Sequence, residues 1–400
     1  MRLARQKLLE DIGDHAPVYI YGFGLAGRWL SAQLPGRVHG FIDTDLKRRG
    51  ARFGPLSVMS IHDARDQLLP GAVIIVSVID IQDVLEVVRG IPNSRSLAMG
   101  LYLESGSVQP SEGINESPEF VAYSLSAVEE YHKAYFDPDK LFLRSVDVMI
   151  TERCSLKCRD CSNLMQYYEK PVNIDRQEVL RDFDELAKNV DHIFEVRLIG
   201  GEPFLNKDIY GIIASLVESP KISRLVIFSN AMIPFREDGM LVLRHPKVVL
   251  SLTNYGDLAK STMDNVSRLE KAGIPYRLHP PENWTDSGVI HDFGRSAPEN
   301  EHLFENCCGK NLLTLSMGRL YRCPFAANAD RLGAIPADSA NAVNSAEGRS
   351  AIRHYTREIR SLPACNFCKG RSFDAPEIVP ALQTRQPIPY RRFRLEPSGD

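Results

Sequence analysis

The first 150 residues of this 400-residue chain contain no cysteine, and all eight cysteines fall into three groups, at 154–161, 307–323 and 365–368. A secreted domain held by disulfides would distribute its cysteines differently, so the grouping favours metal binding in a reducing cytoplasm. No uninterrupted apolar run approaches the roughly 18 residues of a membrane span, and the N-terminal residues lack the apolar centre of a signal peptide. The net charge of −3 provides no general attraction to nucleic acid. We therefore expect a cytoplasmic protein with no membrane span and no nucleic-acid partner.

Residues 17–104 alternate between strand-like and helix-like patterns around a glycine-rich turn. An apolar run precedes Gly22-Phe-Gly24-Leu-Ala-Gly27, and a helical stretch and a second apolar run, ending at Asp43, follow it. Gly22 would shape the turn, and Gly24 would let a phosphate approach the N-terminus of the helix. Asp43 stands where a ribose-binding acid is expected. This order predicts a Rossmann-like domain with a nucleotide site.

The stretch from Val18 through Gly54 is similar to small Rossmann-like domains of bacterial sugar-modifying enzymes, including the N-terminal domains of nucleotide-sugar acyltransferases. That resemblance implies a nucleotide-sugar site. However, about 90 residues make only half of a dehydrogenase nucleotide fold. A degenerate fold that serves as a docking platform is therefore the alternative interpretation.

Three cysteines stand within eight residues, in Cys154-Ser-Leu-Lys-Cys158-Arg-Asp160-Cys161, after the strand-like run 146–150. A structural zinc takes four ligands, and an electron-carrying cluster is usually held by four thiolates, whereas three thiols suit a [4Fe-4S] cluster with one open iron. The C-x3-C-x2-C spacing resembles the radical S-adenosylmethionine (SAM) enzymes. In that family the open iron binds SAM, and an electron from the cluster splits it to a 5′-deoxyadenosyl radical. The chain departs from the family at Asp160, where an aromatic residue is usual.

From about residue 141 to 280, apolar runs alternate with helical patterns, which predicts parallel strands with right-handed crossovers. The expected strands are 146–150, 195–199, 224–228, 248–252 and 276–279, and the expected helices are 176–190 and 207–218. The family resemblance implies a partial (βα)6 barrel, with functional groups at the C-terminal ends of the strands.

Gly200-Gly201-Glu202, followed by proline, ends the second expected strand and matches the GGEP signature of the family. The two glycines allow a ligand to approach the backbone. The resemblance implies that backbone carbonyls and the Glu202 carboxylate accept hydrogen bonds from the SAM ammonium group. It also implies that Asn230 and Ser251, at the ends of the next two strands, contact SAM.

The cysteines beyond residue 300 resemble the shortened SPASM, or twitch, extension, which carries one auxiliary [4Fe-4S] cluster. The expected ligands are Cys308, Cys323, Cys365 and Cys368, with Cys307 as the alternative to Cys308. A structural zinc held by four thiolates is the competing interpretation.

These patterns together predict an α/β chain with a Rossmann-like N-terminal domain, a partial (βα)6 radical SAM barrel and a small cysteine-rich, twitch-like extension. The expected boundaries are 1–105 for the Rossmann-like domain, 106–140 for a linker with one helix, 141–300 for the barrel, 301–375 for the auxiliary cluster domain and 376–400 for a tail rich in proline and arginine.

The expected reaction is reductive cleavage of SAM followed by hydrogen abstraction from a substrate. The substrate would be a sugar, in particular a nucleotide-linked precursor of a bacterial glycan, that is oxidised, dehydrated or epimerised. A flavodoxin or ferredoxin would donate the electron. Glu282 and His291, near Trp284, are candidates for substrate binding or proton transfer, although an ordinary surface loop explains them equally well. The alternatives are a peptide-modifying maturase and a non-catalytic scaffold that binds an iron–sulfur cluster or zinc.

Overall fold

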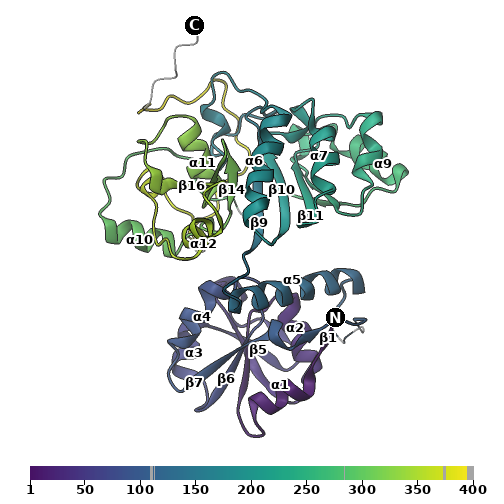
Figure 1. Cartoon of the computed structure of the whole chain (residues 1–400), viewed down its shortest axis with the longest axis vertical. Coiled ribbons are helices and arrows are strands. Elements are labelled where there is room, and N and C mark those ends of the chain that lie inside the picture. Colours follow the sequence, from purple (N-terminus) through teal and green to yellow (C-terminus); the bar gives the residue numbers. More distant parts are fainter. Residues whose placement is uncertain (109–110, 112, 283, 373–374, 394–400) are drawn as a thin grey trace. The chain divides into compact units, whose positions relative to one another are not determined.

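The computed structural model of the chain describes residues 1–108, 111, 113–282, 284–372 and 375–393. It divides into two units, Met1–Arg144 and Ser145–Asp400, and each has its own β-sheet (Figure 1).

The first unit contains a mostly parallel sheet. Its strands are β2 (Val18–Tyr21), β3 (Val38–Asp43), β4 (Arg52–Phe53), β5 (Leu56–Ser60), β6 (Ala72–Val76) and β7 (Ser94–Ala98), and a separate pair joins β1 (Arg2–Leu3) to β8 (Leu103–Glu104). In the described part of the unit the strand order is β4-β5-β3-β2-β6-β7, and every pair except β4–β5 is parallel. The chain therefore extends the sheet to one side of β2 and then, from β6, to the other. Open α/β sheets bind ligands at such a reversal, beyond the carboxyl end of the central strand.

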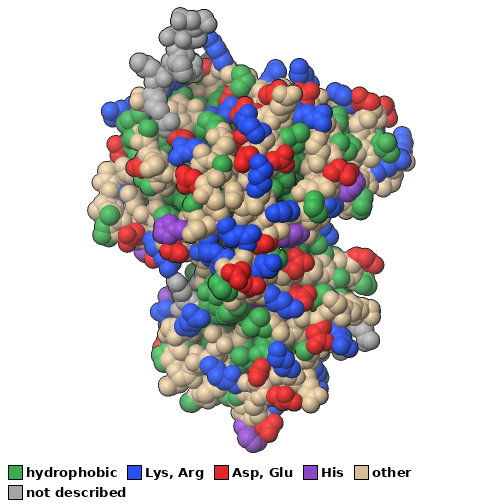
Figure 2. All heavy atoms as spheres, in the orientation of Figure 1, with side chains coloured by type: hydrophobic (Ala, Val, Ile, Leu, Met, Phe, Trp, Pro, Cys, Tyr) green, Lys and Arg blue, Asp and Glu red, His purple; other side chains and the backbone are tan. Residues whose placement is uncertain are grey.

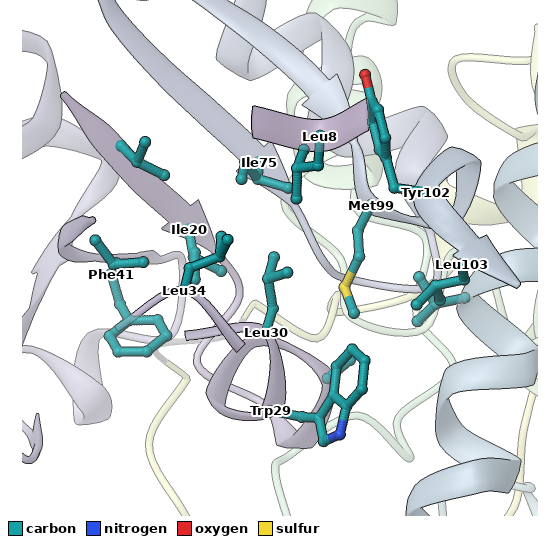
Figure 3. Close-up of a cluster of buried hydrophobic side chains, with 14 of the residues drawn as sticks. Leu8, Ile20, Trp29, Leu30, Leu34, Phe41, Ile75, Met99, Tyr102 and Leu103 are labelled. Atoms are coloured by element: carbon teal, nitrogen blue, oxygen red, sulfur yellow. The ribbon is translucent and has the colours of Figure 1, made fainter. Parts of the chain in front are cut away.

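Helices cover this sheet and bury its apolar strands. They are α1 (Arg5–Ile12), α2 (Leu25–Gln33), α3 (Ile61–Gln67), α4 (Ile81–Arg89) and α5 (Pro118–Phe136). Figure 3 shows Trp29 and Leu30 of α2 pointing into a cluster with Ile20 of β2 and Met99. The strands were expected from their apolar runs because a parallel sheet with helices on its faces leaves few positions in contact with water.

Helix α5 lies in the segment 106–140, for which the sequence predicts a linker with one helix. Val121, Leu125 and Val128 of this helix are at most 3% exposed, and they belong to the same buried cluster as Leu30. The helix therefore contributes to the core of the first unit instead of bridging two domains.

The second unit begins with the predicted alternation of strands and helices. The strands are β9 (Phe142–Thr151), β10 (His192–Gly200), β11 (Ile222–Ser229), β12 (Val248–Thr253) and β13 (Tyr276–His279), and the helices are α6 (Arg176–Asn189), α7 (Ile209–Val217), α8 (Met240–Leu243) and α9 (Thr262–Ala272). Strands β10 to β13 pair in parallel, and α6, α7 and α9 lie along this part of the sheet (Figure 1). All five strands expected from residue 146 onward are confirmed in position.

The remaining strands extend the sheet past β9. These elements are β14 (Thr314–Ser316), β15 (Arg319–Tyr321), β16 (Ala342–Asn344), α10 (Ala297–Glu305), α11 (Pro324–Arg331) and α12 (Arg349–Arg357). Strand β14 is parallel to β9, whereas β15 and β16 continue antiparallel. Within the described residues the order is β13-β12-β11-β10-β9-β14-β15-β16, so the last three strands belong to the same sheet as the first five.

Acidic and basic side chains are interspersed over the face of the second unit that Figure 2 shows. No helix of the described residues has the length and apolar character needed to cross a membrane.

Candidate functional site

The three clustered cysteines lie on the loop that follows β9, and this loop is hydrogen-bonded to the end of β10. The Gly201 N–H donates to the Thr151 carbonyl over 3.2 Å, and the Glu202 N–H donates to the Arg153 carbonyl over 2.7 Å. The first cysteine follows directly at position 154. The carboxyl ends of two neighbouring strands thus meet where the thiols begin.

The two glycines at the end of β10 make this contact possible. A Cβ atom on Gly200 would stand 2.0 Å from the Thr151 carbonyl oxygen, and one on Gly201 would stand 2.3 Å from the Arg153 carbonyl oxygen. Gly200 also has a φ of 146°, which side chains disfavour. The space that their missing side chains leave is occupied by the backbone of the cysteine loop.

Glu202 is fully buried and hydrogen-bonded within the protein. One carboxylate oxygen accepts from the Ser229 hydroxyl and the Phe204 N–H, at 2.8 and 3.1 Å, and the other accepts from the Asn230 N–H at 2.8 Å. Burial raises the pKa of Glu202 to about 7, although these three donors lower it. The carboxylate therefore ties the end of β10 to the end of β11. This is a different role from the contact with the SAM ammonium group that the sequence resemblance implies.

The thiols of the cysteine loop lie in apolar surroundings. A cluster of buried residues joins Leu156 and Cys158 to Ala381, and Cys154, Cys161, Met232, Tyr255 and Trp284 pack against it. Burial raises the pKa of all three thiols, and that of Cys158 to about 11. Burial, and then the neighbouring thiols, also raise the pKa of Tyr255. Thiols in such a site ionise when a metal supplies the compensating charge.

Asn230 and Ser251 occupy neighbouring strand ends, as the sequence predicts. The Asn230 amide nitrogen lies 3.0 Å from the Ser155 hydroxyl and 3.9 Å from the Cys154 sulfur. The Ser251 hydroxyl lies 3.2 Å from Nε2 of His279. Asn230 is thus in direct contact with the cysteine loop, whereas the contacts of Ser251 are with the adjacent strand.

Two residues beside the loop escaped the sequence analysis. The Gln166 amide donates to the carbonyls of Cys161 and Gly288, at 3.2 and 2.9 Å. A Cβ atom on Gly288 would stand 2.7 Å from the Asp160 carbonyl carbon. These residues hold the third cysteine against a loop more than a hundred positions away, and no spacing rule indicates such a contact.

A second group of thiols lies beyond β13. Three of them accept backbone N–H groups: Cys307 from Gly309 at 3.4 Å, Cys323 from Ala326 at 3.4 Å and Cys368 from Gly370 at 3.3 Å. The pKa of Cys323 is raised to about 12 and that of Cys365 to about 11, by burial first and then by thiols of the same group. Burial also raises the pKa of Cys368, and its neighbours Cys323, Cys307 and Cys365 raise it further.

Cys308 does not share this environment. It is exposed, and the charged neighbours that affect its pKa are Arg371 and Cys307. Cys307, by contrast, acts on the pKa of Cys323, Cys365 and Cys368. The exposure of Cys308 and the effect of Cys307 on these three pKa values favour Cys307, which the sequence offers as the alternative ligand. Adjacent residues on a turn point in different directions, and the sequence does not show which one faces inward.

Neither group of thiols converges on a single point. Within the described residues no group of three or more His, Cys, Asp and Glu side chains is placed to hold one metal ion. In a [4Fe-4S] cluster each cysteine binds a different iron atom, so its thiolates need not meet at one point. The donor set of the first loop, three thiols on one short segment, fits such a cluster.

The candidate substrate residues separate into two places. Glu282 and Trp284 line a cavity of about 240 Å³ together with Glu377, Ile378 and two prolines. The Trp284 ring lies 6.4 Å from that of Tyr255, edge to face, which connects the cavity to the apolar cluster around the thiols. His291 is exposed, and its N–H donates to the Phe367 carbonyl in the segment of Cys365 and Cys368.

The glycine-rich turn of the first unit lies after β2, where the sequence predicts it, and its residues contact one another. Gly22 has a φ of 105°, and a Cβ atom on Gly27 would stand 2.0 Å from the Gly22 carbonyl oxygen, whereas one on Gly24 would meet nothing within 4 Å. The Asp43 carboxylate accepts the Phe23 N–H at 2.8 Å and pairs with a guanidinium group at 3.1 Å. Asp43 therefore braces the turn, and a contact with ribose remains a prediction.

A sequence profile of the radical SAM superfamily matches residues 148–287, which span the first cysteine loop and strands β10 to β13. The chain thus contains a segment that is similar to the radical SAM superfamily, and its curated relatives are enzymes. Enzymes of that superfamily use a [4Fe-4S] cluster and SAM.

Curated relatives match parts of the chain. The GTP 3′,8-cyclase of Acidothermus cellulolyticus is 24% identical over 180 residues, which are 40% of this chain and 49% of the relative. The PqqA peptide cyclase of Granulibacter bethesdensis is 31% identical over 77 residues, 19% of this chain and 20% of the relative. The chain therefore spans about half or less of the length of these relatives.

Solved structures show weaker similarity. BtrN in complex with AdoMet and 2-DOIA has a TM-score of 0.39 and 14% identity, over 58% of this chain and 94% of that one. SuiB of Streptococcus suis, bound to S-adenosylmethionine, has a TM-score of 0.30 and 17% identity, over 41% of this chain and 40% of that one.

Proposed function

We propose that the chain cleaves SAM reductively at a [4Fe-4S] cluster held by Cys154, Cys158 and Cys161. The observation that carries this proposal is the set of three thiols on one loop, at the carboxyl end of β9 and within the matched segment. Three thiolates leave one iron of such a cluster for another ligand. When bound, the cluster and SAM would supply a 5′-deoxyadenosyl radical that takes hydrogen from an unactivated carbon of the substrate.

The surrounding residues would serve this chemistry by position and by excluding water. Asn230, beside Cys154, and Ser251, on the next strand, are the polar groups proposed to bind SAM. Gly200, Gly201 and Glu202 would fix the loop through the backbone contacts described above, and the glycine carbonyls are the remaining candidates for the SAM ammonium group. The apolar residues around the thiols would keep water from a reactive site.

For the second group of thiols we propose one auxiliary [4Fe-4S] cluster in a twitch-like extension, held by Cys307, Cys323, Cys365 and Cys368. The support is the effect of Cys307 on the pKa of the other three thiols, together with the backbone N–H groups that three of the four thiols accept. Hydrogen bonds to sulfur tune the potential of iron–sulfur clusters. A structural zinc is the alternative, since four thiolates also suit zinc.

As substrate class we propose a nucleotide-linked sugar, with a flavodoxin or ferredoxin as electron donor. The support is the first unit, whose strand order reverses at β2 beside the glycine turn, as in Rossmann-like nucleotide-binding domains. Glu282, at the cavity next to Trp284, is the proposed substrate contact, and His291 is a second candidate nearer the auxiliary thiols. Oxidation, dehydration and epimerisation all begin with hydrogen abstraction.

A peptide substrate is the second candidate, because one curated relative is a PqqA peptide cyclase. Titration of the full chain with UDP-glucose separates the two. Gly24→Ala adds a methyl group where a phosphate would approach, without meeting protein atoms. We expect binding by the wild type and at least about tenfold weaker binding by the variant, with an unchanged melting temperature. Absence of binding by the wild type would favour the peptide.

SAM cleavage is tested by the formation of 5′-deoxyadenosine from SAM under anaerobic reducing conditions. We expect product with the wild type and with Cys308→Ala, and only background with Cys158→Ala. Lack of product from fully reconstituted wild-type protein would favour a non-catalytic scaffold.

A further inference from the structure

A C-terminal segment, residues 381–384, lies against the first cysteine loop. The Arg159 N–H donates to the Leu382 carbonyl over 2.6 Å, and the Thr384 N–H donates to the Lys157 carbonyl over 2.7 Å. These bonds form an antiparallel bridge in which Cys158 is opposite Gln383. The loop is therefore bordered on this side by a strand-like segment 225 residues further along the chain.

The side chain of Gln383 continues this contact to the cysteine itself. Its Oε1 accepts the Lys157 N–H at 2.7 Å, and its Nε2 donates to the Cys158 sulfur at 3.3 Å and to the Ala381 carbonyl at 2.7 Å. Because the oxygen accepts from a backbone N–H, the nitrogen must face the sulfur. One amide group thus bonds the loop backbone and the cysteine sulfur together, although the residue as a whole is exposed.

Ala381 fixes the segment on the other side of Gln383. Its φ is +57°, a conformation that non-glycine residues seldom adopt, and it is only 4% exposed in the cluster with Leu156 and Cys158. Such a conformation persists where surrounding contacts hold it. The segment is therefore positioned by packing as well as by hydrogen bonds.

We propose that Gln383 is a positioning residue of the SAM-binding cluster, which it serves by holding the cysteine loop and by donating a hydrogen bond to the Cys158 ligand. This inference rests on the proposed function. An N–H group directed at a ligand sulfur stabilises the more negatively charged, reduced cluster, so it raises the reduction potential. Gln383 thereby makes the cluster easier to reduce.

Two variants separate the bond to the Lys157 N–H from the bond to the Cys158 sulfur. Gln383→Met retains an unbranched side chain of similar length and removes the bonds to the Lys157 N–H, the Cys158 sulfur and the Ala381 carbonyl. Gln383→Glu retains the acceptor for the Lys157 N–H and replaces the donor with a negative charge. Gln386→Met is the matched control, because Gln386 is an exposed glutamine three residues further along the chain. All three are compared with the wild type in the full chain.

The first measurement is amide hydrogen exchange at Lys157 in protein without iron. We expect faster exchange in Gln383→Met and wild-type exchange in Gln383→Glu and Gln386→Met. The second is the midpoint potential of the SAM-binding cluster in reconstituted protein, followed by its electron paramagnetic resonance signal. We expect a shift to more negative potential in both Gln383 variants and none in Gln386→Met.

The outcomes distinguish this inference from the proposed function. A reconstituted cluster with an unchanged potential in both Gln383 variants would overturn the donation to Cys158. Unchanged exchange at Lys157 in Gln383→Met would overturn the hold on the loop. Failure of the wild type to bind iron at Cys154, Cys158 and Cys161 would instead overturn the proposed function, and the exchange experiment would still decide whether Gln383 holds the loop.

Discussion

The two groups of cysteines in the second unit differ in number, in origin along the chain and in surroundings. The first group has three thiols on one loop of eight residues, next to Asn230 and the ends of two strands. The second has four thiols from three separate segments, at 307, 323 and 365–368, and Cys307 affects the pKa of the other three. Three thiolates leave a cluster open to a reactant, whereas four close it. The difference agrees with the proposal of one reactive centre and one centre that only transfers electrons or stabilises the fold.

The largest effect is expected from a change that disrupts the first group of thiols without replacing a cysteine. In Gly201→Ala the new Cβ would stand 2.3 Å from the Arg153 carbonyl oxygen and 2.7 Å from the Cys154 Cβ, so the loop must shift. We expect the loss of about four of about eight irons, together with all SAM cleavage. Iron content and 5′-deoxyadenosine formation after anaerobic reconstitution measure both.

The matched control lies in the second group. Gly309→Ala would bring a Cβ to 3.6 Å from the Cys307 sulfur, an ordinary contact, so both clusters should remain. If Gly201→Ala kept its iron and its activity, the tight approach of the two backbones would not be what places the first loop.

A smaller effect is expected where the two adjacent cysteines of the second group are compared. Cys307→Ala should lower the iron content from about eight to about four while SAM is still cleaved, and Cys308→Ala should change neither. The reason is that Cys307 acts on the other three thiols and Cys308 is exposed. The reverse pattern of iron loss would restore Cys308 as the ligand. If the wild type instead contained about four irons together with zinc, the second group would be a structural zinc site.

The smallest expected effect concerns Glu202, whose hydrogen bonds hold the strand ends beside the first group, and it is measured as a pH dependence of stability. Burial raises its pKa from 4.5 to about 7, so its protonated form is favoured in the folded state. The stabilisation that comes from protonated Glu202 is complete below pH 4.5 and is lost as the pH rises through 7. The free energy of unfolding should fall by up to about 3 kcal/mol over this range. Glu202→Gln cannot titrate and should lack this dependence.

The two proteins are compared without iron in a Trp29→Phe background, so that Trp284 fluorescence reports unfolding of the second unit. Equal pH dependence of the unfolding free energy in both, between pH 4.5 and 8, would show that Glu202 does not titrate in the folded protein over this range.

Local patterns were enough to predict the strands and the first group of thiols. Apolar runs mark the strands β9 to β13, and three cysteines on one loop need no distant residue to define them. The roles of Asp43 and Glu202 were less accessible, because the backbone N–H groups that they accept come from other loops. Gln383 was not accessible at all, since a polar residue in a proline-rich tail gives no sign of a partner 225 positions away.

The most direct test of the account is iron and acid-labile sulfide in anaerobically reconstituted protein, for the wild type and for the triple variant Cys154→Ala, Cys158→Ala, Cys161→Ala. The account predicts about eight irons in the wild type and about four in the variant, because only the auxiliary cluster remains. About four irons in the wild type and none in the variant would support the first cluster and exclude the second. Iron that the triple variant does not change would contradict the central claim that these three thiols hold the SAM-binding cluster.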